Sequence, residues 1–380
     1  MKGDLLRAAF LSVWAVLLSA GFLQVANGLQ TDVISVRADL EAFSAGTIGL
    51  MMATYYVGYS LAPLAGRFII GRIGHVSTIV TGALVAAAII LAHPLLVTPL
   101  VWAGYRFVSG FALSLVYVAY ESWINDRVPN ALRGRVFSSY MVVQMATMTL
   151  AQALLGVGDP RTAGLFILCS VVFVLAVVPV SAARRLAPAS APPEPLGVVK
   201  LFQVSPLAAA ATMLAGVSWA IIFTFGPIYA QRAGFDLAGI GLFMGLAMAA
   251  GGLLQFPLGW LSDVLGRRPV IAVILVTGLC ASLFGVWGAH RGVSANLIAA
   301  TLVGGFTFPL YGVCVAYVND AIGSETRIAA AAGLVLLFGI GSIFGPLLCG
   351  WATTAMGPTA FFAMLAATMA TGVLIASRYR

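Results

Sequence analysis

One face of an expected helix carries both a guanidinium and a carboxylate within a strongly apolar stretch, residues 98–124. Arg106, Gly110, Leu113, Tyr117 and Glu121 follow one another at intervals of three or four residues, so they share one helix face. Charged groups in such a stretch are costly to bury and are candidates for binding a ligand or a proton. The position nevertheless leaves two interpretations open for each charge.

Glu121 either binds a proton or a ligand, or it closes a gate by pairing with Arg72, Arg133 or Arg135. Arg106 either faces a cavity or extends to the membrane surface as an anchor. Protonation would remove the burial cost of an isolated carboxylate, which makes Glu121 the chief candidate for proton coupling.

The composition predicts a membrane protein that crosses the bilayer many times. Of 380 residues, 61% are hydrophobic and 8% are charged, whereas a soluble domain carries about 25% charged residues. A span needs about 20 apolar residues. Twelve stretches qualify, namely 8–30, 46–70, 76–93, 98–124, 134–156, 162–183, 206–230, 237–261, 270–289, 294–318, 328–350 and 358–376. The first is long and lacks a clear A-x-A site, so we interpret it as an uncleaved helix rather than a signal peptide.

The basic residues fix the expected orientation of these spans. With the N-terminus inside, the inner connections hold fifteen of the twenty Lys and Arg residues and the outer connections hold four, Arg106 lying within a span. This bias places both termini in the cytoplasm, in a bacterial inner membrane. The net charge of +8 therefore reflects topology, and we expect no nucleic-acid partner.

The chain divides into two similar halves. A Pro-rich connection, 184–205, separates an expected six-helix bundle at 1–183 from another at 206–380. SGFALSLVYVAYESWINDRV from Ser109 aligns with GGFTFPLYGVCVAYVNDAI from Gly304, which indicates an internal duplication. Asp126 and Asp320 correspond, so we interpret both as partners of loop arginines: Asp126 with Arg72, and Asp320 with Arg267 or Arg268. Glu121 has no counterpart, which favours a role in substrate binding or coupling.

A loop motif lies between the eighth and ninth spans. In GWLSDVLGRRP, the pattern G-x-x-x-D-x-x-G-R-R is formed by Gly259, Asp263, Gly266, Arg267 and Arg268. Gly259 would permit close helix packing and Gly266 a tight turn, while the Asp and Arg side chains would tie helix ends together. A degraded copy in the first half keeps Arg72 and Gly74.

On these motifs the chain resembles the major facilitator superfamily (MFS) over its full length. YRFVSGF, YESWIND and FPLYGVCVAYVND look like its YcaD-like branch. The resemblance implies an all-α fold of twelve helices in two bundles. These would rock around a cavity lined by spans 1, 4, 7 and 10, and a monomer would suffice. It also implies that Arg106, which begins an R-x-x-x-G motif, faces that cavity.

Further polar and aromatic residues are candidates for the cavity wall. Helix–helix hydrogen bonding or packing toward lipid is the alternative for each. They are Gln24, Asn27 and Gln30 on the outer part of span 1, Gln144 and Gln152 in span 5, Trp219, Phe223 and Tyr229 in span 7, and Tyr311 and Tyr317 in span 10.

The sequence thus predicts a secondary transporter of a small organic solute, a drug or metabolite, with export favoured and proton coupling as a hypothesis. An uncoupled facilitator and a lipid or amphiphile flippase remain alternatives, and a non-transporting receptor or scaffold is the rival class. No P-loop, nucleophile–base pair or metal-ligand spacing is present, so we expect no enzyme activity, cofactor or metal.

Overall fold

The computed structural model describes residues 2–188, 197–323 and 327–378, and these residues form helices and connections without a strand. The first half holds α1 (Lys2–Leu40), α2 (Ala45–Ile73), α3 (His75–Ala92), α4 (Pro99–Arg127), α5 (Asn130–Leu154) and α6 (Gly164–Ala182). The second holds α8 (Pro206–Arg232), α9 (Leu237–Leu265), α10 (Arg267–Gly288), α11 (Val293–Thr307), α12 (Pro309–Ala321), α13 (Arg327–Met356) and α14 (Ala360–Arg378). A short helix, α7 (Val198–Val204), and the turns η1 (Leu155–Val157) and η2 (Arg184–Leu186) complete the described chain.

The predicted all-helical membrane fold is confirmed. Eleven helical segments of the described chain are long and apolar enough to cross a membrane. One of them, Val293–Ala321, combines α11 and α12, which are interrupted at Phe308 just before Pro309. The remaining long helix, α2, includes Arg67, Arg72 and Pro63. It nevertheless packs within the bundle, against α4 and α13.

The first span is longer than predicted. The sequence places its end near residue 30, but α1 continues to Leu40. The polar run that suggested an end faces protein instead, because Gln30 and Asp32 are buried. A polar side chain can remain inside a span when neighbouring helices cover it. Gln24 and Asn27 consequently lie near the middle of α1 rather than at its outer part.

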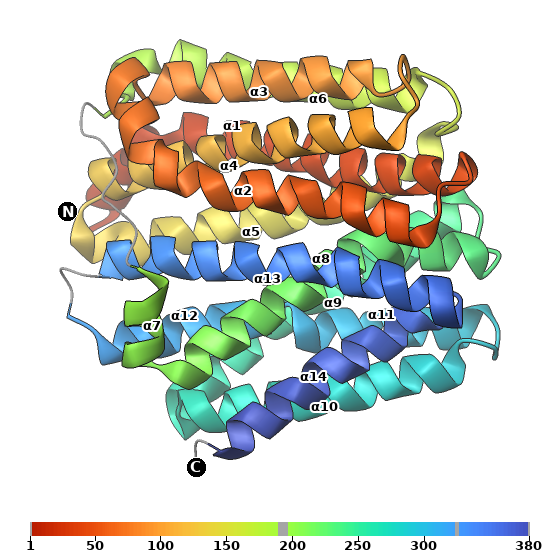
Figure 1. Ribbon diagram of the computed structural model, residues 1–380. Coiled ribbons are helices and arrows are strands. Elements are labelled where there is room, and N and C mark those ends of the chain that lie inside the picture. Colours follow the sequence, from red (N-terminus) through yellow and green to blue (C-terminus); the bar gives the residue numbers. More distant parts are fainter. Residues whose placement is uncertain (1, 189–196, 324–326, 379–380) are drawn as a thin grey trace.

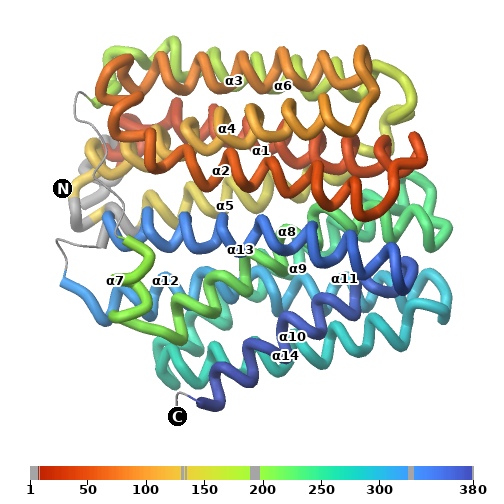
Figure 2. Tube along the Cα trace, viewed as in Figure 1, coloured from red at the N-terminus to blue at the C-terminus, as the bar shows by residue number. Residues whose placement is uncertain are grey.

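Figure 1 and Figure 2 show α1 to α6 on one side of the molecule and α8 to α14 on the other. We call these sets the N-half and the C-half. The two marked chain ends lie at the same end of the bundle, which we call the terminus face, and the other end is the opposite face. The main contacts between the halves are those of α2 with α13, α5 with α9 and α1 with α8.

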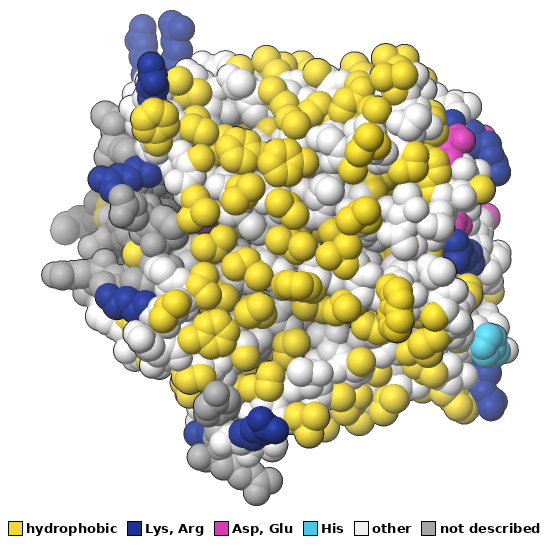
Figure 3. Space-filling view, in the orientation of Figure 1, with side chains coloured by type: hydrophobic (Ala, Val, Ile, Leu, Met, Phe, Trp, Pro, Cys, Tyr) yellow, Lys and Arg dark blue, Asp and Glu magenta, His cyan; other side chains and the backbone are white. Residues whose placement is uncertain are grey.

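The surface between the two faces is apolar. Figure 3 shows hydrophobic side chains across the middle of the molecule and charged ones gathered at its two ends. Phe68, Leu253, Trp260 and Trp351 are each at least 66% exposed. Large aromatic and aliphatic side chains this exposed are stable in hydrocarbon and not in water. The apolar surface between the two faces is therefore the lipid-facing surface.

Glycines allow the helices to approach closely where the halves meet. A Cβ atom on Gly49 of α2 would lie 2.3 Å from the carbonyl oxygen of Pro346 on α13, and one on Gly241 of α9 would lie 2.4 Å from the carbonyl oxygen of Gln152 on α5. Both contacts lie toward the opposite face. Backbones in direct contact leave no passage there, so the opposite face is closed in this structure.

An ion pair joins the halves at the same face. Arg232, the last residue of α8, holds Asp39 near the end of α1 with Nη2 2.5 Å and Nε 3.1 Å from Oδ1. The Asp39 side chain is 10% exposed and that of Arg232 is 32% exposed. This pair therefore lies at the edge of the closed face, partly in contact with solvent.

Candidate functional site

A cavity lies between the halves and extends from the middle of the bundle toward the terminus face. It encloses about 1340 Å³, including its opening to solvent. Its wall is rich in aromatic rings, amides and methionines, with Glu121 as its charged side chain among the described residues. The predicted candidates that line it are Gln24, Asn27, Tyr117, Glu121, Gln144, Trp219, Phe223 and Tyr311.

Glu121 is the chemically distinctive group of this wall. It lies six residues before the end of α4, half-buried, and makes no hydrogen bond or ion pair with the described side chains. The phenols of Tyr59, Tyr140 and Tyr311 are near enough to interact with it electrostatically. An unpaired carboxylate among aromatic rings can bind a cation or a proton.

The gate pairing considered for Glu121 is not seen with two of its three expected partners. The guanidinium of Arg72 lies 5.9 Å from the ring centroid of Phe68 on its own helix, and Arg135 is exposed. The side chain of Arg133, the third, lies outside the described residues. Glu121 thus lines the cavity and forms no ion pair with Arg72 or Arg135.

A hydrogen-bonded network of amides and phenols crosses the N-half wall. Tyr117 donates to Oε1 of Gln24 over 2.6 Å, and Asn27 donates to the Tyr117 hydroxyl over 3.4 Å. Tyr55 and Gln30 both donate to Oδ1 of Asn27, over 3.3 and 3.0 Å. Asn27 and Tyr117 line the cavity, whereas Gln30 is buried behind it and orients Asn27. The network fixes polar groups that a ligand would meet.

Arg106 does not line the cavity. Its side chain is 1% exposed, and its guanidinium carbon lies 4.2 Å from the ring centroid of Tyr55. Its Nε and Nη1 atoms have no hydrogen-bond partner among the described residues. The two charged residues expected on one face of α4 therefore have different surroundings. Glu121 reaches the cavity, whereas Arg106 lies behind the Tyr55 ring, where a cation–π contact holds it.

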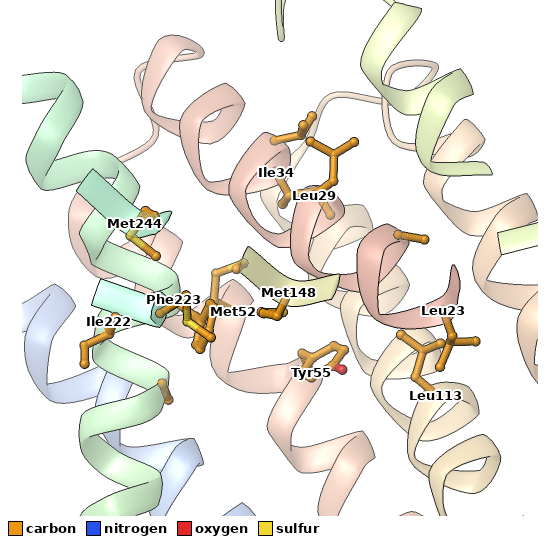
Figure 4. Close-up of a cluster of buried hydrophobic side chains, with 14 of the residues drawn as sticks. Leu23, Leu29, Ile34, Met52, Tyr55, Leu113, Met148, Ile222, Phe223 and Met244 are labelled. Atoms are coloured by element: carbon orange, nitrogen blue, oxygen red, sulfur yellow. The ribbon is translucent and has the colours of Figure 1, made fainter. Parts of the chain in front are cut away.

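The C-half supplies a wall of packed aromatic rings. The centroid of Trp219 lies 5.1 Å from that of Phe223 and 4.8 Å from that of Phe308, the residue at which the tenth span is interrupted. Tyr311 packs on Phe338 at 5.1 Å. Phe223 belongs with Met52 and Met148 to the buried cluster drawn in Figure 4. Rings and thioethers of this kind accommodate flat apolar ligands.

Two of the predicted aromatic candidates lie elsewhere. Tyr229 is buried in the C-half, where its hydroxyl donates to Asn296 and its ring stacks on Phe361. Tyr317 is half-buried on α12 but is not part of the cavity wall. Spacing placed both on spans expected to line the cavity, but did not show which way each ring points.

The loop motif ties helix ends together within the C-half. Arg267 contacts Asp263, donates to Asp320 over 2.8 Å and donates to Ser262 over 2.7 Å. Asp320 thus pairs with Arg267 rather than Arg268. Gly266 has a φ of +91°, which suits glycine at this tight turn. Contrary to expectation, Gly259 makes no close approach, since a Cβ there would meet nothing within 4 Å.

The first-half copy of the motif is built differently. Gly74 keeps the turn, with a φ of +81°. The expected pair of Asp126 with Arg72 is not formed, because Arg72 lies against Phe68. Nε of Arg127 lies 4.0 Å from Oδ2 of Asp126. The two halves therefore differ at the terminus face although their sequences correspond.

Sequence reasoning missed two features near the opposite face. Asp32 was not considered, because the first span was expected to end before it, and Asp39 and Arg232 are 193 residues apart. The buried position of Asp32 could have been suspected from its place in the long apolar context of residues 8–40. The ion pair has no signal in the sequence.

The ion pair leads to a first prediction. Asp39→Asn removes a partly exposed pair, which typically contributes about 0.2–1 kcal/mol, so it should favour opening of the opposite face by about 1.4- to fivefold. Opening is measured as the rate at which a maleimide labels Ala45→Cys in a chain without other cysteines. Ala45 is 6% exposed and packs on Gly350, so the cysteine should react only when this face opens. The charge swap Asp39→Arg with Arg232→Asp should restore slow labelling. Equal rates in all three chains would contradict the prediction.

Comparisons with known proteins agree with this architecture. The family model described as Major Facilitator Superfamily matches residues 7–252 and, a second time, residues 208–380. The protein named "Uncharacterized MFS-type transporter YcaD" from Escherichia fergusonii is 23% identical over 304 residues, covering 79% of this chain and 78% of that protein. Its namesake from Escherichia coli K12 is 22% identical over 326 residues, covering 85% and 84%.

Solved structures show the same fold. The crystal structure of the nucleoside transporter NupG aligns with a TM-score of 0.79 at 13% identity, covering 97% of this chain and 98% of that one. A bacterial homologue of the human lysosomal transporter Spinster, in an inward-facing and unoccupied conformation, aligns with a TM-score of 0.76 at 14% identity, covering 98% and 96%. At these identities the likeness concerns the fold alone.

Proposed function

Since this chain belongs to the major facilitator superfamily and is a YcaD-like transporter, we propose that it exports a small organic solute, a drug or metabolite, by proton-coupled alternating access. The observation that carries the proposal is the cavity between the halves. It is closed toward the opposite face and contains one unpaired carboxylate, Glu121, among aromatic rings. A cavity closed at one face is one of the two states that alternating access requires.

The orientation follows from charge. The connections at the terminus face carry most of the Lys and Arg residues, so we assign this face to the cytoplasm and the membrane to the bacterial inner membrane. The closed opposite face is then the outer face. In this state the cavity would receive solute from the cytoplasmic side, which is the loading step of an exporter.

The cavity wall suggests a class of solute. Trp219, Phe223, Tyr59 and Tyr311 offer ring faces, which attract cations as well as flat apolar groups. Glu121 adds a carboxylate without a described cation to neutralise it. A monocationic amphiphile with an aromatic group fits these surroundings, whereas an anion would meet repulsion.

Glu121 would also provide the coupling. A carboxylate in this wall can be neutralised by a bound cationic solute or by a proton, and the two compete for the same charge. Solute leaving to the outside would let a proton take its place, and the protonated cavity would return to the cytoplasmic side. The residues 1–183 and 206–380 would move as two bundles during this cycle.

The first test is a binding measurement. Aromatic monocations are added to the purified protein and the melting temperature is followed, with a neutral analogue of the same shape as the control. A ligand at 100 times its Kd stabilises the folded state by about 2.7 kcal/mol, so a cation that binds should raise the melting temperature. If the cation and the neutral analogue raised the melting temperature equally, Glu121 would have no role in recognising the solute. Flux of the bound cation in liposomes then separates a transporter from a receptor or scaffold.

A further inference from the structure

A second carboxylate is buried outside the cavity. Asp32 lies on α1 eight residues before its end at Leu40, or about 12 Å along the helix axis. Its side chain is 0% exposed, and neither carboxylate oxygen has a hydrogen-bond partner among the residues that the structure describes. The preceding residue, Thr31, lines the cavity, but Asp32 does not. Asp32 points instead into the N-half.

Two further oxygen atoms near it also lack partners. Gln152 on α5 lies within interaction range of the Asp32 carboxylate and is 1% exposed. Its Nε2 donates to the carbonyl of Met148 over 3.4 Å, while its Oε1 has no partner in the described part of the chain. The hydroxyl of Ser35, one turn beyond Asp32, is buried and likewise has no described partner. A proton on Asp32 would supply the hydrogen-bond donor that Oε1 of Gln152 lacks among the described residues.

The described charges around Asp32 are used elsewhere. On α1, Arg37 contacts Glu41 at 2.5 Å and the carbonyl of Pro160 at 3.0 Å, and Asp39 is held by Arg232 of α8. Cys169 of α6 interacts electrostatically with Asp32. The other titratable and charged groups on neighbouring helices are Tyr55 of α2, whose ring packs against Arg106, and Arg106, Tyr117 and Glu121 of α4. None of them is a cation paired with Asp32.

The site lies directly behind the closure of the opposite face. The carbonyl of Gln152 is the atom that a Cβ on Gly241 of α9 would meet at 2.4 Å. The side chain of Gln152 therefore lies within interaction range of Asp32, while its backbone meets the C-half. Opening of the opposite face would require α5 to separate from α9, which would uncover Gln152.

We propose that Asp32 and Gln152 form a proton-binding site, separate from the cavity, which exchanges its proton with the outside when α5 separates from α9. In the closed state the neutral carboxyl of Asp32 donates its hydrogen to Oε1 of Gln152. An ionised Asp32 has no described counter-ion here, and an unpaired buried charge is far more costly than a protonated carboxyl. Ionised Asp32 therefore needs water, which the open state supplies.

The direction of the effect follows. A proton stabilises the closed opposite face, and its loss stabilises the open one, so acid on the outside should close this face. The inference rests on the proposed transport function in one respect, since it requires that the opposite face opens. It is independent of the solute, because closure can be measured without one.

The experiment measures opening directly. The Ala45→Cys reporter, in a chain whose four native cysteines are replaced, is reconstituted in nanodiscs and labelled with a maleimide from pH 5.5 to pH 9. Rates are divided by those of a small free thiol, which removes the reagent's own pH dependence. The corrected rate should rise with pH, by up to about tenfold per pH unit, the limit for a one-proton equilibrium.

Variants assign that dependence to the site. Asp32→Asn has the shape of the protonated carboxyl and should label slowly at every pH. Asp32→Glu should keep a pH-dependent rate, and Gln152→Leu should move its midpoint. Asp159→Asn, which removes an exposed carboxylate in an opposite-face loop, is the matched control and should behave like the parent chain.

Several results would overturn the proposal. They are a pH-independent rate in the parent chain, a pH dependence that survives Asp32→Asn, and no labelling at any pH, since a site that never opens cannot exchange its proton. A rate set by added Na⁺ at constant pH would assign the site to a metal cation instead. Loss of flux with an intact pH-dependent rate would count against the proposed function alone.

Discussion

Glu121→Gln should abolish solute accumulation driven by a pH gradient. Glutamine keeps the size of the side chain and can still form hydrogen bonds, but it cannot ionise. In proteoliposomes with an inwardly or outwardly directed pH gradient, the mutant should bring the solute only to equal concentrations on both sides. Binding of an aromatic cation should weaken by about tenfold or more, because a hydrogen bond to a charged group contributes about 1.5–3 kcal/mol.

Asp159→Asn is the control for Glu121→Gln, because it removes a carboxylate outside the cavity. It should transport like the parent chain. If Glu121→Gln still accumulates solute against its gradient, Glu121 is not the coupling residue. If it transports downhill at the parent rate with unchanged affinity, then Glu121 contributes to neither recognition nor coupling, and an uncoupled facilitator becomes the better description.

Gly110→Val should prevent the N-half from packing. A Cβ atom on Gly110 of α4 would lie 2.0 Å from the carbonyl oxygen of Tyr55 on α2, and Gly58 meets Phe107 of α4 in the same way at 2.1 Å. No side-chain rotation relieves a clash with backbone, so the helices must separate along their whole contact. We expect a cost of at least about 3 kcal/mol, seen as aggregation or a strongly lowered melting temperature in detergent.

Gly104 on the same helix provides a matched control. It is exposed, and a Cβ there would meet nothing within 4 Å. Gly104→Val should therefore be tolerated, and Gly104→Ala should be neutral or stabilising because alanine favours helix by about 1 kcal/mol. Similar melting temperatures for Gly104→Val and Gly110→Val would show that the contact between α2 and α4 adapts, contrary to the prediction.

Much of the fold follows from patterns that are local in the sequence. Apolar stretches mark the spans, and the Gly-Arg-Arg turn marks a loop, because each depends on neighbouring residues. The end of the first span could not be located in this way. The polar residues Asn27, Gln30 and Asp32 suggest that the span ends there. The helix continues through the membrane because other helices cover these side chains.

The site was predictable as a set of residue types rather than as an arrangement. Spacing placed Glu121 and Arg106 on one face of a helix, but that face is about 20 Å long, so the two side chains have different neighbours. One end reaches the cavity, and the other is covered by the Tyr55 ring. The pair of Asp39 with Arg232 depends on how the halves meet, which sequence spacing does not report.

The same ion pair links the molecule to the composition of the external medium. Arg232 is partly exposed, and dissolved ions screen charges over about 8 Å at physiological ionic strength. Backbone contacts such as that of Gly49 with Pro346 are unaffected by salt, whereas the contribution of this pair weakens as salt rises. Concentrated salt outside should therefore raise the frequency of opening at that face, and dilute medium should lower it. Ionic strength would thus act on the transport cycle from one side of the membrane only, without any dedicated binding site for an ion.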